Sequence, residues 1–217
     1  MLARLKNKEM CNRLILEMRE SGFDYGRVEI TMSSLDKTLA RRRISEIASS
    51  QGKIPEEVVI DVLVASEGRV ITSIEVLSER NVVNALIHPL SIVASNGSGY
   101  GVDHAKSGEK VHPRSFGAFT KVLEKYVKKE GLLSWEDAIY KMTGLPATRF
   151  GIKKRGKLQE GNFADILVID PDRIESPATA ENPYQYSKGV DTVLVNGKII
   201  LNEGELNSQK SGIVIKS

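Results

Sequence analysis

The sequence predicts an α/β protein in which strands alternate with helices up to about residue 150 and a small antiparallel β domain, residues 151–217, follows. Two observations support this prediction. Over residues 1–150, short apolar runs alternate with stretches of helical periodicity, which is typical of a parallel sheet built from βα units. Beyond residue 150, short strands are separated by glycines, and Asn196-Gly197 supplies the positive φ angles of a two-residue hairpin turn.

The first part of the chain is expected to alternate helices with short strands. Helices are indicated by apolar residues spaced three or four apart, several of them followed by a glycine, at residues 5–21, in a stretch that contains Ile44 and Ile47 and ends near Gly52, and at residues 55–67 and 78–86. Strands are indicated by short apolar and β-branched runs at residues 28–32, 70–76 and 90–95. Strands that are each followed by helical sequence predict a parallel sheet.

Two further helices and the β tail complete the expected elements. A helix with Phe119 and Val127 on its apolar side follows the long loop of residues 96–115, and Ser134 with Asp137 forms a capping box for the next helix. The strands of the tail are expected at residues 164–169, 192–195, 198–201 and 212–215.

Composition and charge argue against several classes of function. The 217 residues carry 31 basic and 28 acidic side chains, and the longest basic run, Arg41–Arg43, lies in an expected amphipathic helix, so no nucleic-acid partner is expected. The single cysteine, Cys11, excludes an internal disulfide framework, fits a reducing compartment and is expected to be buried on a helix. No segment approaches the roughly 18 consecutive apolar residues that cross a membrane, so we expect a cytoplasmic protein without a membrane partner.

The expected strands are too few for a closed barrel. A (β/α)8 barrel takes about 250 residues, whereas about 150 precede the β tail here. Three parallel strands would leave unpaired edges and uncovered apolar faces. The chain is therefore expected to be the second part of a larger fold.

A series of short motifs occurs in the order found in one enzyme family. These motifs are residues 45–48, 78–89, 95–97, 112–119, 141–147, 149–151, 161–165 and 195–197. From about residue 35 onward, they resemble the C-terminal part of an N-acyl-D-amino-acid deacylase, also called D-aminoacylase, of the amidohydrolase superfamily. The segment Gly161–Asp165 is typical of the whole superfamily, whereas Lys141–Gly144 and His112–Arg114 narrow the resemblance to D-aminoacylases.

The resemblance implies a fold and a cofactor. The family fold is a metal-dependent (β/α)8 barrel with a small β domain, so residues 1–150 would be the C-terminal portion of such a barrel, with residues 91–95 as its eighth strand. Zinc is the implied cofactor, but the family's ligands would lie in the N-terminal portion, and no metal ligand is expected in this chain. A zinc site needs ligands that converge on a rigid frame. The three histidines of the chain, His88, His104 and His112, do not offer such an arrangement.

The resemblance also implies three site residues. At the position of Asn96 the family has an aspartate that takes a proton from metal-bound water and passes it to the leaving amine, which an asparagine cannot do. The alternative is that Asn96-Gly97 only forms a turn. Arg114 matches an arginine expected to hold the substrate's carboxylate with two parallel donors, or else it only ties the loop to the barrel mouth. Gly97 is the second expected substrate-binding residue.

Two routes could supply the carboxylate that Asn96 lacks. An asparagine followed by glycine cyclises readily, so Asn96 could deamidate to aspartate. Asp103, seven residues further on, could also substitute, although no motif places it in the site.

The expected function is that of a C-terminal fragment or subunit of a metal-dependent amidohydrolase, which hydrolyses the amide bond of N-acyl amino acids and is inactive without an N-terminal half that carries the metal ligands. The expected partner is that half, as a separate polypeptide, or a second copy of this chain. The alternative is a catalytically dead remnant or a binding subunit, and a free-standing enzyme of a new type is a third interpretation. Whether the chain alone is an enzyme stays open.

Overall fold

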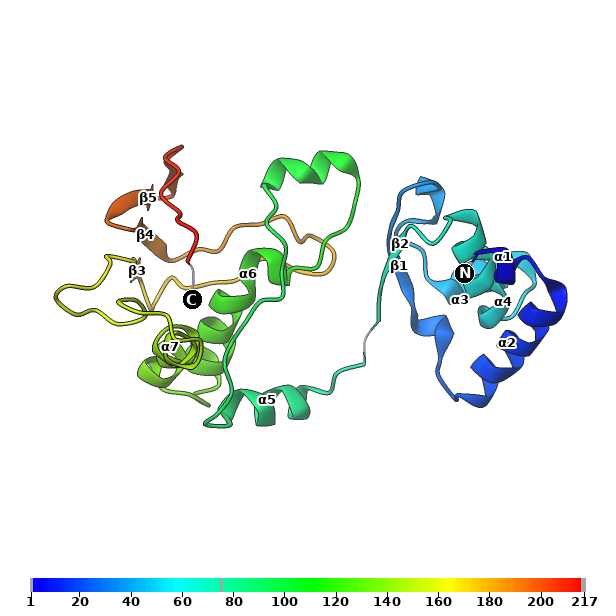
Figure 1. Cartoon of the computed structure of the whole chain (residues 1–217), viewed down its shortest axis with the longest axis horizontal. Coiled ribbons are helices and arrows are strands. Elements are labelled where there is room, and N and C mark those ends of the chain that lie inside the picture. The colour runs from blue at the N-terminus through cyan, green and yellow to red at the C-terminus, as the bar shows by residue number, and fades with distance from the viewer. Residues whose placement is uncertain (1, 75, 216–217) are drawn as a thin grey trace. The chain divides into compact units, whose positions relative to one another are not determined.

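The computed structural model describes residues 2–74 and 76–215 (Figure 1). They form two compact units, each with a hydrophobic core of its own. The first unit contains the residues up to Leu77 together with Asp103–Val111, and the second contains Ser78–Val102 and the residues from His112 onward. The expected boundary at residue 150 lies inside the second unit, and the division into residues 1–150 and 151–217 stays a prediction.

The first unit packs helices against a two-stranded sheet. Its elements are α1 (Leu2–Leu5), α2 (Lys8–Glu20), the 3-10 helices Tyr25–Arg27 and Lys37–Leu39, β1 (Glu29–Ser33), α3 (Ile44–Gln51), α4 (Pro55–Ala65) and β2 (Val70–Ser73). The core lies between β1, α3 and α4, where Ile30, Ile47 and Val58 are almost fully buried. α3 ends where it does because Gly52 enters the left-handed region, with a φ of 64°.

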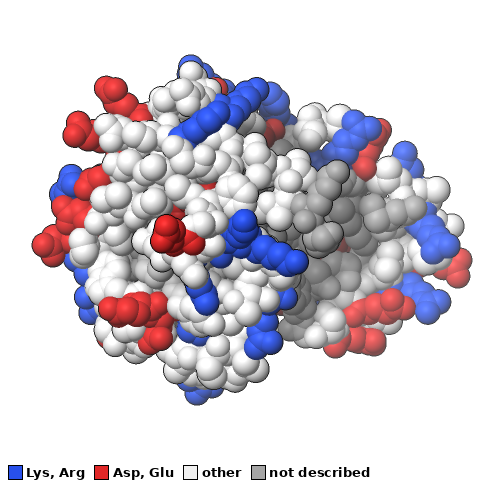
Figure 2. All heavy atoms as spheres, turned by 60° about the vertical axis from the view of Figure 1, so that its left-hand side comes forward, with Lys and Arg blue, Asp and Glu red and all other residues white. Residues whose placement is uncertain are grey.

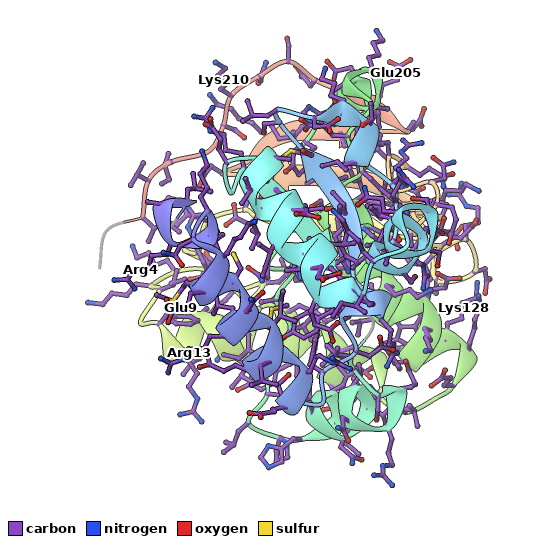
Figure 3. The ribbon with its side chains drawn as sticks, turned by 90° about the vertical axis from the view of Figure 1, so that its right-hand side faces the viewer. Arg4, Glu9, Arg13, Lys128, Glu205 and Lys210 are labelled. Atoms are coloured by element: carbon purple, nitrogen blue, oxygen red, sulfur yellow. The ribbon has the colours of Figure 1, made fainter. Side chains whose placement is uncertain are left out.

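The helix expected over residues 5–21 is interrupted. The side chain of Asn7 accepts the N–H of Met10 at 3.0 Å and caps α2 as a separate helix. Cys11 is half-buried, and its thiol donates to the carbonyl oxygen of Leu5 at 2.8 Å. Figure 3 shows exposed charged side chains on the outer side of these two helices, namely Arg4, Glu9 and Arg13.

β1 and β2 pair antiparallel, which corrects the parallel arrangement expected for them. The register places Glu29 opposite Ser73 and Ser33 opposite Val70. A single connecting helix returns the chain to the start of the first strand and makes the two strands parallel. Here two successive helices, α3 and α4, connect β1 to β2. The second helix turns the chain once more, so β2 runs in the opposite direction.

A segment distant in sequence completes the first unit. The 3-10 helix Val102–Ser107 leads to Lys110, whose ammonium pairs with the carboxylate of Glu29 at 2.6 Å. The backbone N–H of Lys110 donates to the carbonyl oxygen of Thr31 at 3.4 Å. The chain therefore leaves the first unit at residue 77, enters the second, and returns to the first at residue 103.

The second unit gathers helices around a small core. These are α5 (Glu79–Ile87), α6 (Arg114–Lys121), the π-helix η4 that continues it (Val122–Lys129), α7 (Trp135–Met142) and α8 (Gly144–Arg149). The core contains Leu123, Ala138 and Ile174. α7 begins where expected, because the hydroxyl of Ser134 accepts the N–H of Asp137 at 3.0 Å.

Residues 90–95 form no strand, which corrects the expectation of a third strand there. In the part of the chain that the structure describes, the sheets contain only β1 with β2 and β3 to β6. A strand needs a hydrogen-bonded neighbour, and the N–H of Val93 instead donates to the carbonyl oxygen of Lys141 on α7 at 3.2 Å. The eighth barrel strand implied for residues 91–95 is therefore not formed by these residues.

The expected antiparallel tail is confirmed. β3 (Ile166–Ile169), β4 (Val190–Val195), β5 (Lys198–Asn202) and β6 (Glu205–Leu206) form one antiparallel sheet in that order. Asn196 (φ 52°) and Gly197 (φ 77°) form the turn between β4 and β5. β6 replaces the strand expected over residues 212–215, because Gly204 (φ 85°) makes a second tight turn directly after β5.

Charged side chains of both signs are interspersed on the face shown in Figure 2. Oppositely charged side chains also form ion pairs between elements, such as Lys125 with Glu79 at 2.5 Å and Arg173 with Asp191 at 2.7 Å. No helix in the described ranges combines the length and the apolar character needed to cross a membrane. The cytoplasmic location stays a prediction.

Replacing Gly189 tests the packing of the second core. Gly189 has a φ of 74°, and a Cβ atom there would lie 2.5 Å from the backbone nitrogen of Ile174. We expect Gly189→Ala to lower the free energy of unfolding by about 2–4 kcal/mol, because it combines backbone strain with a steric clash. Urea denaturation followed by the fluorescence of Trp135 measures this loss.

Gly161→Ala is the matched control. Gly161 has a similar φ of 82°, but nothing lies within 4 Å of a Cβ atom placed there. The substitution should therefore cost only the backbone strain, about 1–2 kcal/mol. Equal losses in the two variants would contradict the tight packing at Gly189.

Candidate functional site

A cavity of about 390 Å³ lies within the second unit, between the loop after residue 94 and the first turns of α6. Two of the three expected site residues, Gly97 and Arg114, line it. Asn96 does not, although its neighbours Ser95 and Gly97 do. The structure therefore brings together the two residues expected to bind substrate.

α6 begins at Arg114 because the preceding turn is held by hydrogen bonds. Nδ1 of His112 accepts the backbone N–H of Arg114 at 3.1 Å, and the carbonyl oxygen of His112 accepts the N–H of Ser115 at 3.1 Å. The pKa of His112 lies below its ordinary value because the ring is partly desolvated and the positive charge of Arg114 lies nearby. A neutral imidazole can accept the Arg114 N–H, so this shift favours the observed turn.

The segment before β4 fixes the position of α6. The hydroxyl of Ser176 donates to the carbonyl oxygen of Gly117 at 3.1 Å, and the hydroxyl of Ser187 donates to that of Phe116 at 3.2 Å. The ring of Phe116 packs against Tyr184, with ring centroids 5.6 Å apart. The first turn of α6, and with it Arg114, is thus held from the side of the β sheet.

The guanidinium of Arg114 is available to a ligand. The side chain is exposed and forms no hydrogen bond or ion pair with any residue that the structure describes. Apolar groups of Phe119, Leu167 and Val190 line the same cavity, together with the hydroxyl-bearing Ser115. A planar cation beside apolar walls suits a carboxylate that carries an apolar substituent.

Gly97 is required by close packing. A Cβ atom at this position would lie 2.9 Å from Cα of Ser115, so only glycine lets the loop approach the start of α6. Asn96 is exposed and left-handed, with a φ of 46°, a conformation that asparagine tolerates better than most residues. The catalytic and turn interpretations of Asn96 both stay predictions. Asp103, the suggested substitute, belongs to the first unit and does not line the cavity.

A buried lysine holds the segment that leads to Gly97. Lys141 on α7 is 5% exposed. Its ammonium donates to the carbonyl oxygen of His88 at 2.5 Å, to the hydroxyl of Ser91 at 3.1 Å and to the carbonyl oxygen of Ser91 at 3.4 Å. Its own carbonyl oxygen accepts the N–H of Val93 at 3.2 Å. No carboxylate in the described residues pairs with it, so neutral acceptors satisfy the three donors of this ammonium.

The sequence predicts no contact for Lys141 beyond its place in a family motif. One signal was available, because Lys141 lies three residues after the fully buried Ala138 and therefore on the inner face of α7. A lysine on an apolar helix face indicates a buried ammonium that needs acceptors.

The residues described here do not fit a zinc site. No group of three or more His, Cys, Asp and Glu side chains in residues 2–74 and 76–215 could hold a metal ion. The three histidines have local partners: Nδ1 of His88 accepts the N–H of Leu90 at 3.3 Å, His104 pairs with Glu109 at 3.0 Å, and His112 holds the start of α6.

Comparison with known proteins identifies the family. The model of the amidohydrolase family matches residues 24–201. The chain belongs to the amidohydrolase family. Among relatives in this family, the D-aminoacylase of Alcaligenes xylosoxydans xylosoxydans is 34% identical over 190 residues, which cover 88% of this chain and 37% of the relative. The N-acyl-D-glutamate deacylase of the same organism is 44% identical over 97 residues, which cover 45% of this chain and 20% of the relative.

Solved structures of amidohydrolases agree with this assignment. A crystal structure of D-aminoacylase aligns with a TM-score of 0.75 at 31% identity, over 86% of this chain and 37% of that one. The N-acyl-D-glutamate deacylase of Bordetella bronchiseptica, in complex with zinc and a phosphonate inhibitor, aligns with a TM-score of 0.71 at 31% identity, over 86% of this chain and 36% of that one. The resemblance to D-aminoacylases is thus confirmed, and the chain spans little more than a third of the length of these amidohydrolases.

The alignments with solved structures support a mixed α/β fold for this chain. The chain is a mixed α/β amidohydrolase chain that aligns with part of the D-aminoacylase structures. Its assignment as the last part of a (β/α)8 barrel stays a prediction, because the described strands form no barrel sheet.

Replacing Lys141 tests whether its hydrogen bonds hold the segment before Gly97. Lys141→Met keeps the apolar stem but leaves the carbonyl oxygens of His88 and Ser91 without this donor. We expect a loss of about 2–3 kcal/mol in the free energy of unfolding, because hydrogen bonds from a charged donor are the stronger ones. Hydrogen exchange of residues 88–97 should also accelerate.

Lys128→Met provides the matched control. The ammonium of Lys128 also donates to a carbonyl oxygen, that of Asp172 at 2.5 Å, but its side chain is exposed. Lys128 lies at the periphery of the molecule in Figure 3. We expect this variant to lose less than about 1 kcal/mol. If Lys141→Met behaves like the control, the buried ammonium does not hold the segment.

Proposed function

We propose that this chain is the C-terminal part of an amidohydrolase that hydrolyses the amide bond of N-acyl amino acids, and that its cavity binds the carboxylate end of the substrate. The proposal is supported by the family and by the likeness to D-aminoacylases. The chain spans little more than a third of those relatives, so the proposed hydrolysis requires a further region that supplies the metal ligands. The proposed partner is therefore an N-terminal polypeptide of the same enzyme.

The observation that carries this proposal is the unpaired guanidinium of Arg114 beside an apolar cavity. An N-acyl amino acid has a carboxylate next to a side chain that is often apolar. Arg114 offers two parallel N–H donors to the carboxylate, while Phe119 and Leu167 offer apolar surface to the substituent. The loop at Gly97 closes the opposite side of the cavity.

Asn96 favours a second candidate function, that of a binding subunit without turnover. The side chain of asparagine cannot cycle between a carboxylate and a carboxylic acid, so it cannot act as a general acid or base. Such a subunit would keep the ligand site at Arg114 and lack hydrolysis. Mixing the chain with a polypeptide that supplies the N-terminal region of a D-aminoacylase separates the two candidates, because only the first predicts release of free amino acid from an N-acetyl-D-amino acid.

Ligand binding by the chain alone tests the role of Arg114. N-acetyl-D-methionine is titrated and binding is followed by NMR chemical shifts. We expect Arg114→Met to weaken binding at least about tenfold, because a charge-assisted bidentate contact is lost. Arg114→Lys should recover only part of the affinity, since an ammonium lacks the planar pair of donors.

Two controls accompany this titration. Arg149→Met removes an exposed arginine of the same unit that does not line the cavity, and it should leave the affinity unchanged. N-acetyl-D-methioninamide lacks the carboxylate, so its binding should not respond to Arg114→Met. Equal effects of Arg114→Met on both ligands would show that Arg114 does not recognise the carboxylate.

Replacing Asn96 tests its catalytic interpretation. In the protein completed with its N-terminal region, we expect Asn96→Asp to raise the rate of amide hydrolysis by roughly 10² to 10⁴, the usual contribution of a general acid or base. Asn207→Asp adds the same charge at an exposed position in the C-terminal tail and should leave the rate unchanged. An unchanged rate in Asn96→Asp would favour the turn interpretation.

A further inference from the structure

The dipeptide Asn-Gly occurs twice in the sequence, at Asn96-Gly97 and at Asn196-Gly197. In this dipeptide the backbone nitrogen of the glycine can attack the side-chain amide of the asparagine, because glycine has no side chain to hinder the approach. Both asparagines are left-handed, with φ angles of 46° and 52°. The two sites therefore share the same dipeptide and the same left-handed backbone conformation, and they differ mainly in their surroundings.

Asn96 is held weakly. Its side chain is exposed and forms no hydrogen bond with the residues in the described ranges 2–74 and 76–215. The attacking atom, the nitrogen of Gly97, donates only to the hydroxyl of Ser95, at 3.1 Å. Little has to be broken before the amide of Asn96 and the nitrogen of Gly97 can meet.

Asn196 is held at every group that this reaction must move. Its Oδ1 accepts a hydrogen bond from the guanidinium of Arg155, and its Nδ2 donates to the carbonyl oxygen of Ser211 at 2.6 Å. The nitrogen of Gly197 donates to the carbonyl oxygen of Ala164 at 2.9 Å. These bonds have to open before the ring can close, and each adds to the cost of local opening.

We propose that Asn96 is a site of spontaneous deamidation in the folded chain, whereas Asn196 is protected. The nitrogen of Gly97 loses its proton and forms a bond to the side-chain carbonyl carbon of Asn96. The bond from that carbon to the side-chain nitrogen breaks, and ammonia leaves with the proton. Water then opens the succinimide ring: cleavage at the side-chain carbonyl gives aspartate, and cleavage at the main-chain carbonyl gives isoaspartate.

The products change the charge and the main chain of the loop beside the cavity. A carboxylate would appear between Ser95 and Gly97, which both line the cavity, and the net charge of the chain would fall from +3 to +2. The effect on hydrolysis rests on the proposed function, because only the aspartate form offers a proton-exchanging group on an unaltered main chain. The isoaspartate form lengthens the main chain by one carbon next to Gly97, where packing against Ser115 is already tight.

Peptide mapping of the folded full chain after incubation at mildly alkaline pH tests the proposal. Isoaspartate is distinguished from aspartate by isoaspartyl methyltransferase. We expect Asn96 to convert roughly ten- to hundredfold faster than Asn196, because reaction at Asn196 first requires several hydrogen bonds to break. Equal rates, or a faster reaction at Asn196, would overturn the proposal.

Two further measurements separate the effect of the fold from that of the neighbouring sequence. In concentrated urea both sites lose their surroundings, so their rates should converge. A preference for Asn96 that persists in urea would assign it to the flanking residues and defeat the proposal. In the folded chain, Arg155→Met should accelerate reaction at Asn196 and leave Asn96 unchanged.

The variant Asn96→Gln supplies the baseline, since a glutamine side chain cannot close the five-membered ring. Its peptide should keep the amidated mass over the whole incubation. None of these measurements depends on amide hydrolysis, so failure of the proposed function and failure of the deamidation proposal give different results.

Discussion

The close packing of α6 on the segment before β4 determines where the cavity lies. A Cβ atom at Gly117 would clash with the hydroxyl of Ser176, so a larger residue there would force this hydroxyl to turn away and lose its hydrogen bond to the carbonyl oxygen of Gly117. The buried carboxylate of Glu124 accepts the N–H of Ser176 at 2.9 Å and pairs with Lys129 at 2.5 Å. Arg114 is the first residue of the same helix, so the position of the candidate ligand site follows from a contact made one turn later.

The opposite wall of the cavity depends on a different kind of interaction. Among the described residues, no strand pairs with residues 88–93. The ammonium of Lys141 instead binds the carbonyl oxygens of His88 and Ser91, and its carbonyl oxygen accepts the N–H of Val93. This contact fixes the chain shortly before Gly97, which then packs on Ser115. Residues 88–97 are thus held at both ends. The buried ammonium of Lys141 holds the first residues, and the close packing of Gly97 on Ser115 holds the last. The resulting site can receive an anion with an apolar group, whereas the described residues offer no metal centre to act on it.

Features fixed by a few neighbouring residues could be predicted from the sequence. The turn at Asn196-Gly197, the cap at Ser134 and the helix end at Gly52 are confirmed, because each follows from the conformational preference or hydrogen bonding of those residues themselves. The direction of β2 was predicted wrongly although both helices between the strands were predicted, because it depends on how α3 and α4 pack on the sheet and not on the residues of β2 themselves. Residues 90–95 have the composition of a strand, but no strand in the described part of the chain pairs with them.

The candidate site was predictable to a similar extent. Gly97 and Arg114 were found through the family resemblance, and both line the cavity. The partners of Lys141 could not be predicted, because its main acceptors are backbone carbonyl oxygens, which every residue has and which no sequence pattern identifies. The contact of Lys110 with Glu29 could not be predicted for a related reason, since it joins residues that are 81 positions apart.

That contact between Lys110 and Glu29 has a consequence for the continuity of the chain. The first unit is built from two separate stretches, and the stretch between them, Ser78–Val102, belongs to the second unit. A single cleavage in the loop after Gly97 would leave an N-terminal piece and a C-terminal piece that each contribute to both units. Neither unit is therefore a contiguous segment that could be excised whole. A chain nicked there would separate only if residues 103–111 left the first unit and residues 78–97 left the second.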